Sequence, residues 1–264
     1  MSLINVIENK FNNVKYKIET LFLPRTLECV VNGKKILILA ETGKELKRAK
    51  SYETKEPNTL KWIMDFIKPD DVFYDIGANI GLYSIFPAVY EPKCRVYSFE
   101  PESLNFAKIN KNIHLNRLSS KVVAYPIALS SSIKLDKFFI NKFRVGNALH
   151  SFGKSLDNMK KEFKPDHVQG SIGFNLDYLV FDLGLEFPNH VKIDVDGIER
   201  DVVSGGEKVF SDNRVRSVLV EISRDEDYVE NREWFNEFFY SKGFVLSDYE
   251  EKRKDTENLI FKRV

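Results

Sequence analysis

The chain has 264 residues, 43% of them hydrophobic and 30% charged, a composition typical of a soluble globular protein with one large or two small domains. A net charge of +1 gives no electrostatic reason to expect nucleic acid as a partner. Cys29 and Cys94 are the only cysteines, which argues against a disulfide framework and favours a reducing, cytoplasmic location.

Residues 1–55 predict an N-terminal extension made of a helix and a β-hairpin. Charged side chains interrupt residues 1–23, which predicts an amphipathic helix rather than a secretory signal. Two β-rich runs then flank Asn32-Gly33, a dipeptide that suits a type I′ turn. Residues 41–57 are charged and show little periodicity, so they predict a surface connection. No apolar run approaches the roughly 20 residues that a transmembrane segment needs, so none is expected.

Residues 56–264 predict one α/β domain in which strands and helices alternate. Further strands are expected at VFYDIG (72–77), RVYSFE (95–100), KVVAYPIALS (121–130), HVKIDVDG (190–197), RSVLVEIS (216–223), GFVLSDY (243–249) and NLIFKRV (258–264), and helices at 60–68, 81–90, 101–116, 198–210 and 231–243. Near-continuous apolar strands in this alternation indicate a mostly parallel sheet covered on both faces. Residues 138–175 are less regular and are expected to form a lid or acceptor segment.

Carboxylates stand at the C-terminal ends of four predicted strands: Asp75, Glu100, the Asp194 and Asp196 pair, and Glu221. Ligands of open α/β sheets bind beyond these strand ends. A buried ionised side chain is costly unless it is paired or liganded. Each carboxylate alone could cap a helix, but the set predicts a ligand site at this sheet edge.

A glycine turn follows the first of these strands. Gly77 and Gly81 remove Cβ atoms where the backbone must turn and a ligand can come close. Glu100 follows Gly77 by roughly 20 residues, the spacing at which a carboxylate accepts hydrogen bonds from ribose hydroxyls. Asn79 stands where a dinucleotide fingerprint has its second glycine, which disfavours a nicotinamide oxidoreductase. A nucleoside without phosphates fits this turn better.

The order of these motifs resembles the FkbM-type family of S-adenosylmethionine-dependent methyltransferases. The resemblance runs from about residue 56 to the C-terminus and rests on VFYDIGANIGLYSI, YSFEP, PIALSS, VKIDVDGIERDVVSGG and VLVEI. It implies a Rossmann-like class I methyltransferase fold, with a mostly parallel seven-stranded sheet whose last strand is antiparallel. It also implies O-methylation of a saccharide, a glycoconjugate or another polar, hydroxylated metabolite, with S-adenosyl-L-methionine as cofactor.

The resemblance further implies which residues bind the cofactor. They are Asp75, Gly77, Ala78, Asn79 and Gly81 in the cofactor turn, Glu100 with Pro101 at the ribose, Ile127 and Ala128 at the adenine, and Asp194 at the sulfonium. Position 196 often carries glutamate in the family and carries aspartate here, so Asp196 is given no role.

A hydroxyl acceptor must be aligned with the methyl group and must lose its proton, so a general base is expected. Asp194 is the first candidate. His190 lies four residues earlier, at the wrong edge of the sheet, whereas His150 and His167 belong to the irregular segment. Asp194 and Glu221 could hold a divalent metal, but a third carboxylate is not evident, so metal dependence is not expected.

Three further hypotheses follow from the sequence. A chain that kept the fold and lost catalysis would bind S-adenosylmethionine as an interaction module, and only turnover separates this alternative from an enzyme. Lys192, deeper on its strand than Asp194, needs an acidic partner, for which Asp75 is the candidate. The N-terminal hairpin is a candidate contact for a homodimer.

Overall fold

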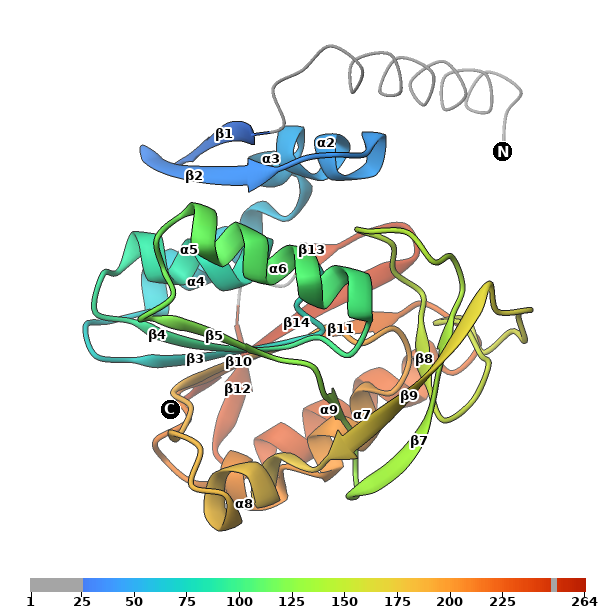
Figure 1. Cartoon of the computed structure of the whole chain (residues 1–264). Helices are drawn as coiled ribbons and strands as arrows, with labels where there is room; N and C mark the ends of the chain where they lie inside the picture. The colour runs from blue at the N-terminus through green and yellow to red at the C-terminus, as the bar shows by residue number, and fades with distance from the viewer. Residues whose placement is uncertain (1–25, 248–250) are drawn as a thin grey trace.

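The computed structural model describes residues 26–247 and 251–264 (Figure 1). The predicted N-terminal helix lies outside the described residues. Strands β1 (Thr26–Val31) and β2 (Lys34–Leu39) form the predicted antiparallel hairpin. Asn32 and Gly33 have φ angles of 46° and 71°, the positive values that a type I′ turn requires.

The central sheet has the predicted α/β architecture. Its strand order is β12 (Phe244–Leu246), β14 (Thr256–Arg263), β11 (Ser217–Ser223), β10 (His190–Ile193), β3 (Val72–Ile76), β4 (Arg95–Phe99) and β5 (Val122–Tyr125), and the short β13 (Glu251–Lys252) also pairs with β14. Strands β11, β10, β3, β4 and β5 run parallel, whereas β14 is antiparallel to both of its neighbours in this order. The predicted antiparallel last strand is therefore confirmed.

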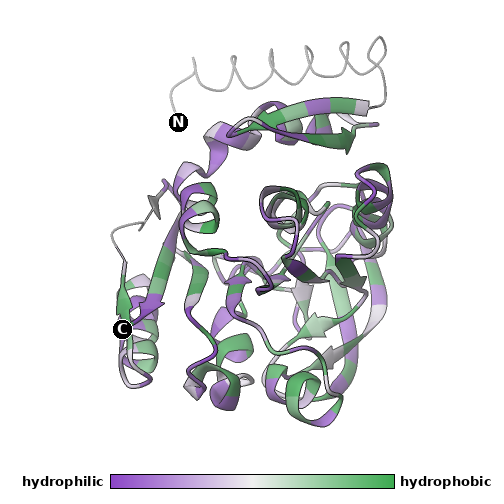
Figure 2. Cartoon of the chain, turned by 90° about the vertical axis from the view of Figure 1, so that its left-hand side faces the viewer, coloured by the Kyte–Doolittle hydropathy of each residue, from purple (hydrophilic) through white to green (hydrophobic). Residues whose placement is uncertain are grey.

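Helices cover both faces of this sheet, which explains why its strands are continuously apolar. Apolar side chains of α4 (Pro57–Phe66), α5 (Leu82–Tyr90) and α6 (Ser103–Leu115) belong to one buried cluster, and those of α7 (Glu199–Ser204), α8 (Glu207–Ser211) and α9 (Tyr228–Tyr240) belong to the other. The two sets lie on opposite sides of the sheet (Figure 1). Figure 2 shows hydrophobic stretches in the strands between these layers. None of the described helices is long and apolar enough to cross a membrane.

The prediction of a surface connection over residues 41–57 is wrong. This segment forms α2 (Gly43–Lys50) and α3 (Tyr52–Lys55), and the Thr42 hydroxyl caps α2 by accepting from the Glu45 backbone N–H at 3.3 Å. Leu46 and Tyr52 are buried, so a narrow apolar face was enough to hold the helices in place. The dense charge hid this face because some of it is internal: Glu45 is buried in an ion pair with Lys108 on α6.

The irregular segment predicted at 138–175 also contains regular structure. A second sheet forms there in the order β6 (Ala128–Leu129), β9 (His167–Phe174), β7 (Lys134–Ile140) and β8 (Ser151–Phe152), and a π-helical turn follows at Tyr178–Asp182. In the lysine-rich β7, only Phe138 and Ile140 are buried, which weakened the strand signal. These two side chains pack with Phe152 in a small apolar cluster next to the central sheet. That this sheet acts as a lid, and that the domain begins at residue 56, stay predictions.

Candidate functional site

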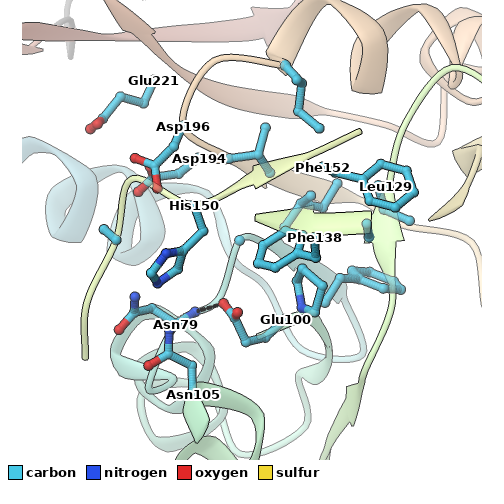
Figure 3. Close-up of a pocket in the computed structure, with 18 of the residues that line it drawn as sticks. Asn79, Glu100, Asn105, Leu129, Phe138, His150, Phe152, Asp194, Asp196 and Glu221 are labelled. Carbon is cyan, nitrogen blue, oxygen red and sulfur yellow. Dashed lines mark hydrogen bonds between the residues drawn. The ribbon is translucent and has the colours of Figure 1, made fainter. Parts of the chain in front are cut away.

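A cavity of about 140 Å³ lies beyond the carboxyl ends of β3, β4 and β10 (Figure 3). Seven of the predicted cofactor residues line it: Gly77, Asn79, Glu100, Pro101, Ile127, Ala128 and Asp194. A smaller cavity of about 30 Å³ shares three of these residues and adds Asp75 and Ala78. The sheet therefore gathers at one edge the residues that the motif order selected.

Gly81 lines neither cavity. A Cβ atom at this position would lie 2.5 Å from Ile109 Cγ1, and the φ angle of 86° is unfavourable for any other residue. Gly81 therefore allows α6 to pack closely against the turn, and its predicted contact with the cofactor remains without support from the geometry.

Gly77 lies where the end of β3 approaches the end of β10. Its φ angle is 80°, and a Cβ atom there would lie 1.8 Å from the Asp194 carbonyl oxygen. The Gly77 and Ala78 backbone N–H groups both donate to the Phe99 carbonyl oxygen, at 3.0 and 3.1 Å. Only glycine permits this approach, which leaves the backbone open to the cavity.

Glu100 is buried and accepts two backbone hydrogen bonds. The Asn79 N–H donates to Oε2 at 2.7 Å (dashed in Figure 3) and the Glu102 N–H donates to Oε1 at 2.9 Å. No cation pairs with it among the residues that the structure describes, and burial raises the pKa of Glu100 to about 8. Further donors, such as the two hydroxyls of a ribose, would stabilise its ionised form.

Lys192 pairs with Asp194 and not with Asp75, its predicted partner. Lys192 Nζ lies 2.9 Å from Asp194 Oδ2, whereas Asp75, opposite Lys192 in the sheet, accepts a hydrogen bond from Ser84 Oγ at 2.5 Å. Burial alone would raise the pKa of Asp194, but Lys192 and neighbouring cations lower it overall. Burial raises the pKa of Asp75 despite the opposing charge of Lys192. Asp194 is thus held as a carboxylate at the cavity wall.

The two carboxylates considered as metal ligands both have cationic partners. Glu221 lines the cavity and forms an ion pair with Arg253, which also contacts the buried Glu56. Asp194 pairs with Lys192. Within residues 26–247 and 251–264, no group of three or more metal-ligating side chains comes together.

The histidines separate as their positions on the chain suggested. His190 is buried at the opposite edge, where Asp71 and Ser217 contact its two ring nitrogens. His150 lines the cavity: its Nδ1 accepts from the Asn141 N–H at 3.2 Å, and its buried Nε2 has no hydrogen-bond partner among the residues that the structure describes. Burial lowers the pKa of His150 to about 4, so its ring is neutral at pH 7. Because Nδ1 accepts, Nε2 carries the proton and is a donor at the cavity wall.

Asp196 has a role that the sequence did not reveal. Its Oδ2 accepts from the Leu149 backbone N–H at 2.6 Å, so it ties the segment before β8 to the end of β10. Burial raises the pKa of Asp196 to about 6. The positive φ of both Asp196 and Leu149, 61° and 63°, accompanies this contact.

Other residues of the cavity wall come from segments without a readable motif. The second sheet contributes Phe138 and Phe152, and the two N-terminal helices contribute Arg48 and Lys55. The wall is therefore apolar beside Ile127 and charged around Asp194. This division suits a nucleoside whose base lies at the apolar end and whose charged substituent lies at the other.

The family model for the methyltransferase FkbM domain matches residues 75–246, more than half of the chain. The chain belongs to the FkbM methyltransferase family. The family predicted from the motif order is thereby confirmed, and the match begins at Asp75, the first residue of the predicted cofactor turn.

Curated relatives of this chain are distant in sequence. The 31-O-demethyl-FK506 methyltransferase FkbM of Streptomyces tacrolimicus is 26% identical over 176 residues, covering 59% of this chain and 66% of that protein. This chain thus spans slightly less than two thirds of that relative. The hexuronic acid methyltransferase AglP of Haloferax volcanii is 24% identical over 200 residues, covering 67% of this chain and 77% of that protein.

Solved structures match much of this chain at low sequence identity. Pyrococcus horikoshii TYW2 in complex with MeSAdo matches with a TM-score of 0.46 and 15% identity, over 90% of this chain and 71% of that one. Precorrin-6y C5,15-methyltransferase from Geobacter metallireducens matches with a TM-score of 0.44 and 12% identity, over 78% and 86% of the two chains.

Proposed function

We propose that this chain is an S-adenosylmethionine-dependent O-methyltransferase that modifies a hydroxyl of a saccharide or another polar metabolite. Membership of the FkbM family supports the reaction class. The names of two relatives, one a 31-O-demethyl-FK506 methyltransferase and one a hexuronic acid methyltransferase, support an oxygen acceptor and a saccharide, respectively.

The observation that carries the proposal is the environment of Glu100. A buried carboxylate that faces a cavity with only backbone N–H partners is incompletely satisfied when ionised. The adjoining Gly77 turn leaves no room for a Cβ atom. Together they fit a ribose with free hydroxyls at Glu100 and a close approach of the backbone at Gly77.

When bound, S-adenosylmethionine would supply an electrophilic methyl group on a positively charged sulfur. Glu100 would accept the ribose hydroxyl hydrogen bonds, and Ile127 with Ala128 would border the adenine. Asp194 would serve as the general base, because Lys192 keeps it ionised and it lines the charged end of the cavity. The chain's main contribution would be to align an acceptor oxygen at this end.

Calorimetry with S-adenosylhomocysteine tests cofactor binding directly. We expect wild-type protein to bind it, and the absence of heat on folded protein would refute the proposal. Turnover is tested with radiolabelled S-adenosylmethionine and a panel of neutral and acidic saccharides. We expect a labelled product with wild type and none with Asp194→Asn, although both bind S-adenosylhomocysteine. Binding without any product would favour the catalytically inactive module instead.

A further inference from the structure

Helix α2 brings one guanidinium group, that of Arg48, to both cavities. Arg48 Nε donates a hydrogen bond to the Gly146 carbonyl oxygen at 2.9 Å, which fixes the side chain between α2 and the segment after β7. This helix precedes residues 75–246, the part of the chain that matches the family. What Arg48 binds is therefore not specified by the family motifs.

Three cations lie on the walls of the two cavities, and they differ in their partners. Lys192 is paired with Asp194 at 2.9 Å, and Lys55 with Glu56 at 2.7 Å. Arg48 forms no ion pair within 4 Å with any residue in the described part of the chain, although it is half-buried; Asp196, on the wall of the larger cavity, is near enough that Arg48 opposes the rise of its pKa. Arginine stays protonated at every pH that proteins tolerate, and a half-buried charge without a counterion is costly.

The surroundings of Arg48 favour an anion. Lys44, on the same helix, lies close enough that Arg48 adds to the effect of burial in lowering the pKa of Lys44. Lys44 donates to the Asn147 side chain, and the Asp196 carboxylate acts electrostatically on both Lys44 and Arg48, so two cations face one acidic group here. A guanidinium presents a planar pair of donors that matches the two oxygens of a carboxylate.

We propose that Arg48 binds a carboxylate group of a ligand held in these cavities; the inference rests on the proposed function. Such a carboxylate has two sources. One is the amino-acid end of the methyl donor, since Arg48 shares the smaller cavity with Asp75, Gly77 and Ala78 of the cofactor turn. The other is an acidic acceptor of the uronic acid class, since Arg48 shares the larger cavity with Asp194.

Two nucleosides distinguish the sources. S-adenosylhomocysteine and 5′-methylthioadenosine share the adenosine and the sulfur, but only the first carries a carboxylate. If the donor is the source, we expect Arg48→Gln to weaken S-adenosylhomocysteine at least tenfold in calorimetry and to leave 5′-methylthioadenosine unchanged. Arg48→Lys keeps the charge without the planar fork, so it should weaken S-adenosylhomocysteine less.

If the acceptor is the source, Arg48→Gln leaves both nucleosides unchanged. Saturation-transfer NMR on protein filled with S-adenosylhomocysteine should then show D-glucuronate binding to wild type and not to the variant. D-glucose is the neutral comparison, and its signal should be equal in both proteins. Lys47 is an exposed neighbour of Arg48 on α2, so Lys47→Gln is the matched control and should leave the binding of all these ligands unchanged.

Three results would overturn the inference. In the first, Arg48→Gln changes the binding of neither S-adenosylhomocysteine nor D-glucuronate. In the second, wild type does not bind D-glucuronate and the variant binds S-adenosylhomocysteine normally. In the third, both nucleosides weaken equally, which indicates a general disturbance of the site. Thermal unfolding checks the fold, and Arg48→Lys replaces the glutamine variant if that one unfolds. Wild type that fails to bind S-adenosylhomocysteine would refute the proposed function itself.

Discussion

Two sets of buried or half-buried carboxylates lie near the same sheet edge and differ in the charge that faces them. The first set has cationic partners: Asp194 with Lys192, Glu56 with Lys55 and Arg253, and Glu221 with Arg253. The second set has backbone N–H partners and no ion pair among the described residues: Glu100, Asp196 and Glu199. Asp194 and Glu221 of the first set and Glu100 and Asp196 of the second set line the larger cavity.

The pKa values of the two sets shift in opposite directions. Burial is the largest influence in both sets, but cations outweigh it at Asp194 and Glu56, whose pKa values are lowered. Without cations, burial raises the pKa of Glu100 to about 8 and that of Glu199 to about 7. In the free protein, cations already stabilise the ionised carboxylates of the first set. The ionised carboxylates of the second set become more stable when a ligand brings hydrogen-bond donors.

The largest effect is expected from removing the cation of the first set. Lys192→Met removes the buried ammonium that pairs with Asp194 and whose residue lies opposite Asp75 in the sheet, which should lower the free energy of unfolding by about 3–5 kcal/mol. Chemical denaturation measures this change. Lys61→Met removes an exposed ion pair with Asp65 and should cost less than about 1 kcal/mol. Equal losses in the two variants would show that Lys192 is not needed to balance the site.

Gly77→Ala tests the close contact between the ends of β3 and β10. The added Cβ meets the Asp194 carbonyl oxygen at a left-handed φ of 80°, so we expect a loss of roughly 3 kcal/mol or more in unfolding free energy. Gly33→Ala is the matched control, because Gly33 has a φ of 71° and nothing within 4 Å of the added atom. The control should cost only the backbone strain, about 1–2 kcal/mol. A Gly77 variant as stable as the control would contradict the close contact between β3 and β10.

Glu100→Ala tests the second set through binding. Loss of hydrogen bonds to a charged group should weaken S-adenosylhomocysteine by about 1.5–3 kcal/mol, or roughly 10- to 150-fold. Isothermal titration calorimetry measures the affinity, and Glu207→Ala, an exposed carboxylate on α8, serves as control. Unchanged affinity in Glu100→Ala would mean that another group binds the ribose.

The sequence predicted those parts of the site that follow from topology. Asp75, Glu100 and Asp194 end parallel strands, and the ends of neighbouring parallel strands must meet at one edge. The sequence did not predict that Arg48 and His150 line the cavity, because long-range contacts position them. The hairpin that precedes α2 is held by Asn112 of α6 and by Asn116, the residue that caps the end of α6; both accept from β2 backbone N–H groups.

Side-chain partners and short strands were also difficult to predict from the sequence. Asp75 and Asp194 were both acidic neighbours of Lys192 in the predicted sheet, and only the side-chain geometry selects Asp194. The contact between Asp196 and Leu149 joins residues 47 positions apart, and the short strand β8 depends on its pairing with β7, so no local periodicity encodes either. Strand ends were thus predictable, and the segments that close over them were not.

The smallest expected effect is a dependence on pH that distinguishes Glu100→Gln from wild type. The folded-state pKa of Glu100, about 8, lies above its ordinary value of 4.5. Its contribution to stability is therefore fully present below pH 4.5 and is lost as the pH rises through 8. Glutamine does not titrate, so the melting temperature of the variant minus that of wild type should increase from pH 6 to pH 9. Asp196 and Glu199 titrate in both proteins and largely cancel in this difference.

Binding should depend on pH in the corresponding sense. Ribose hydroxyls donate to the ionised carboxylate, so wild type should bind S-adenosylhomocysteine more tightly as the pH rises through about 8, whereas Glu100→Gln should show no such gain. Calorimetry at pH 6, 7, 8 and 9 provides the affinities, and thermal scans in the same buffers provide the stabilities. Parallel curves for the two proteins in both measurements would show that Glu100 keeps one protonation state, and the contrast between the two sets of carboxylates would then be structural rather than electrostatic.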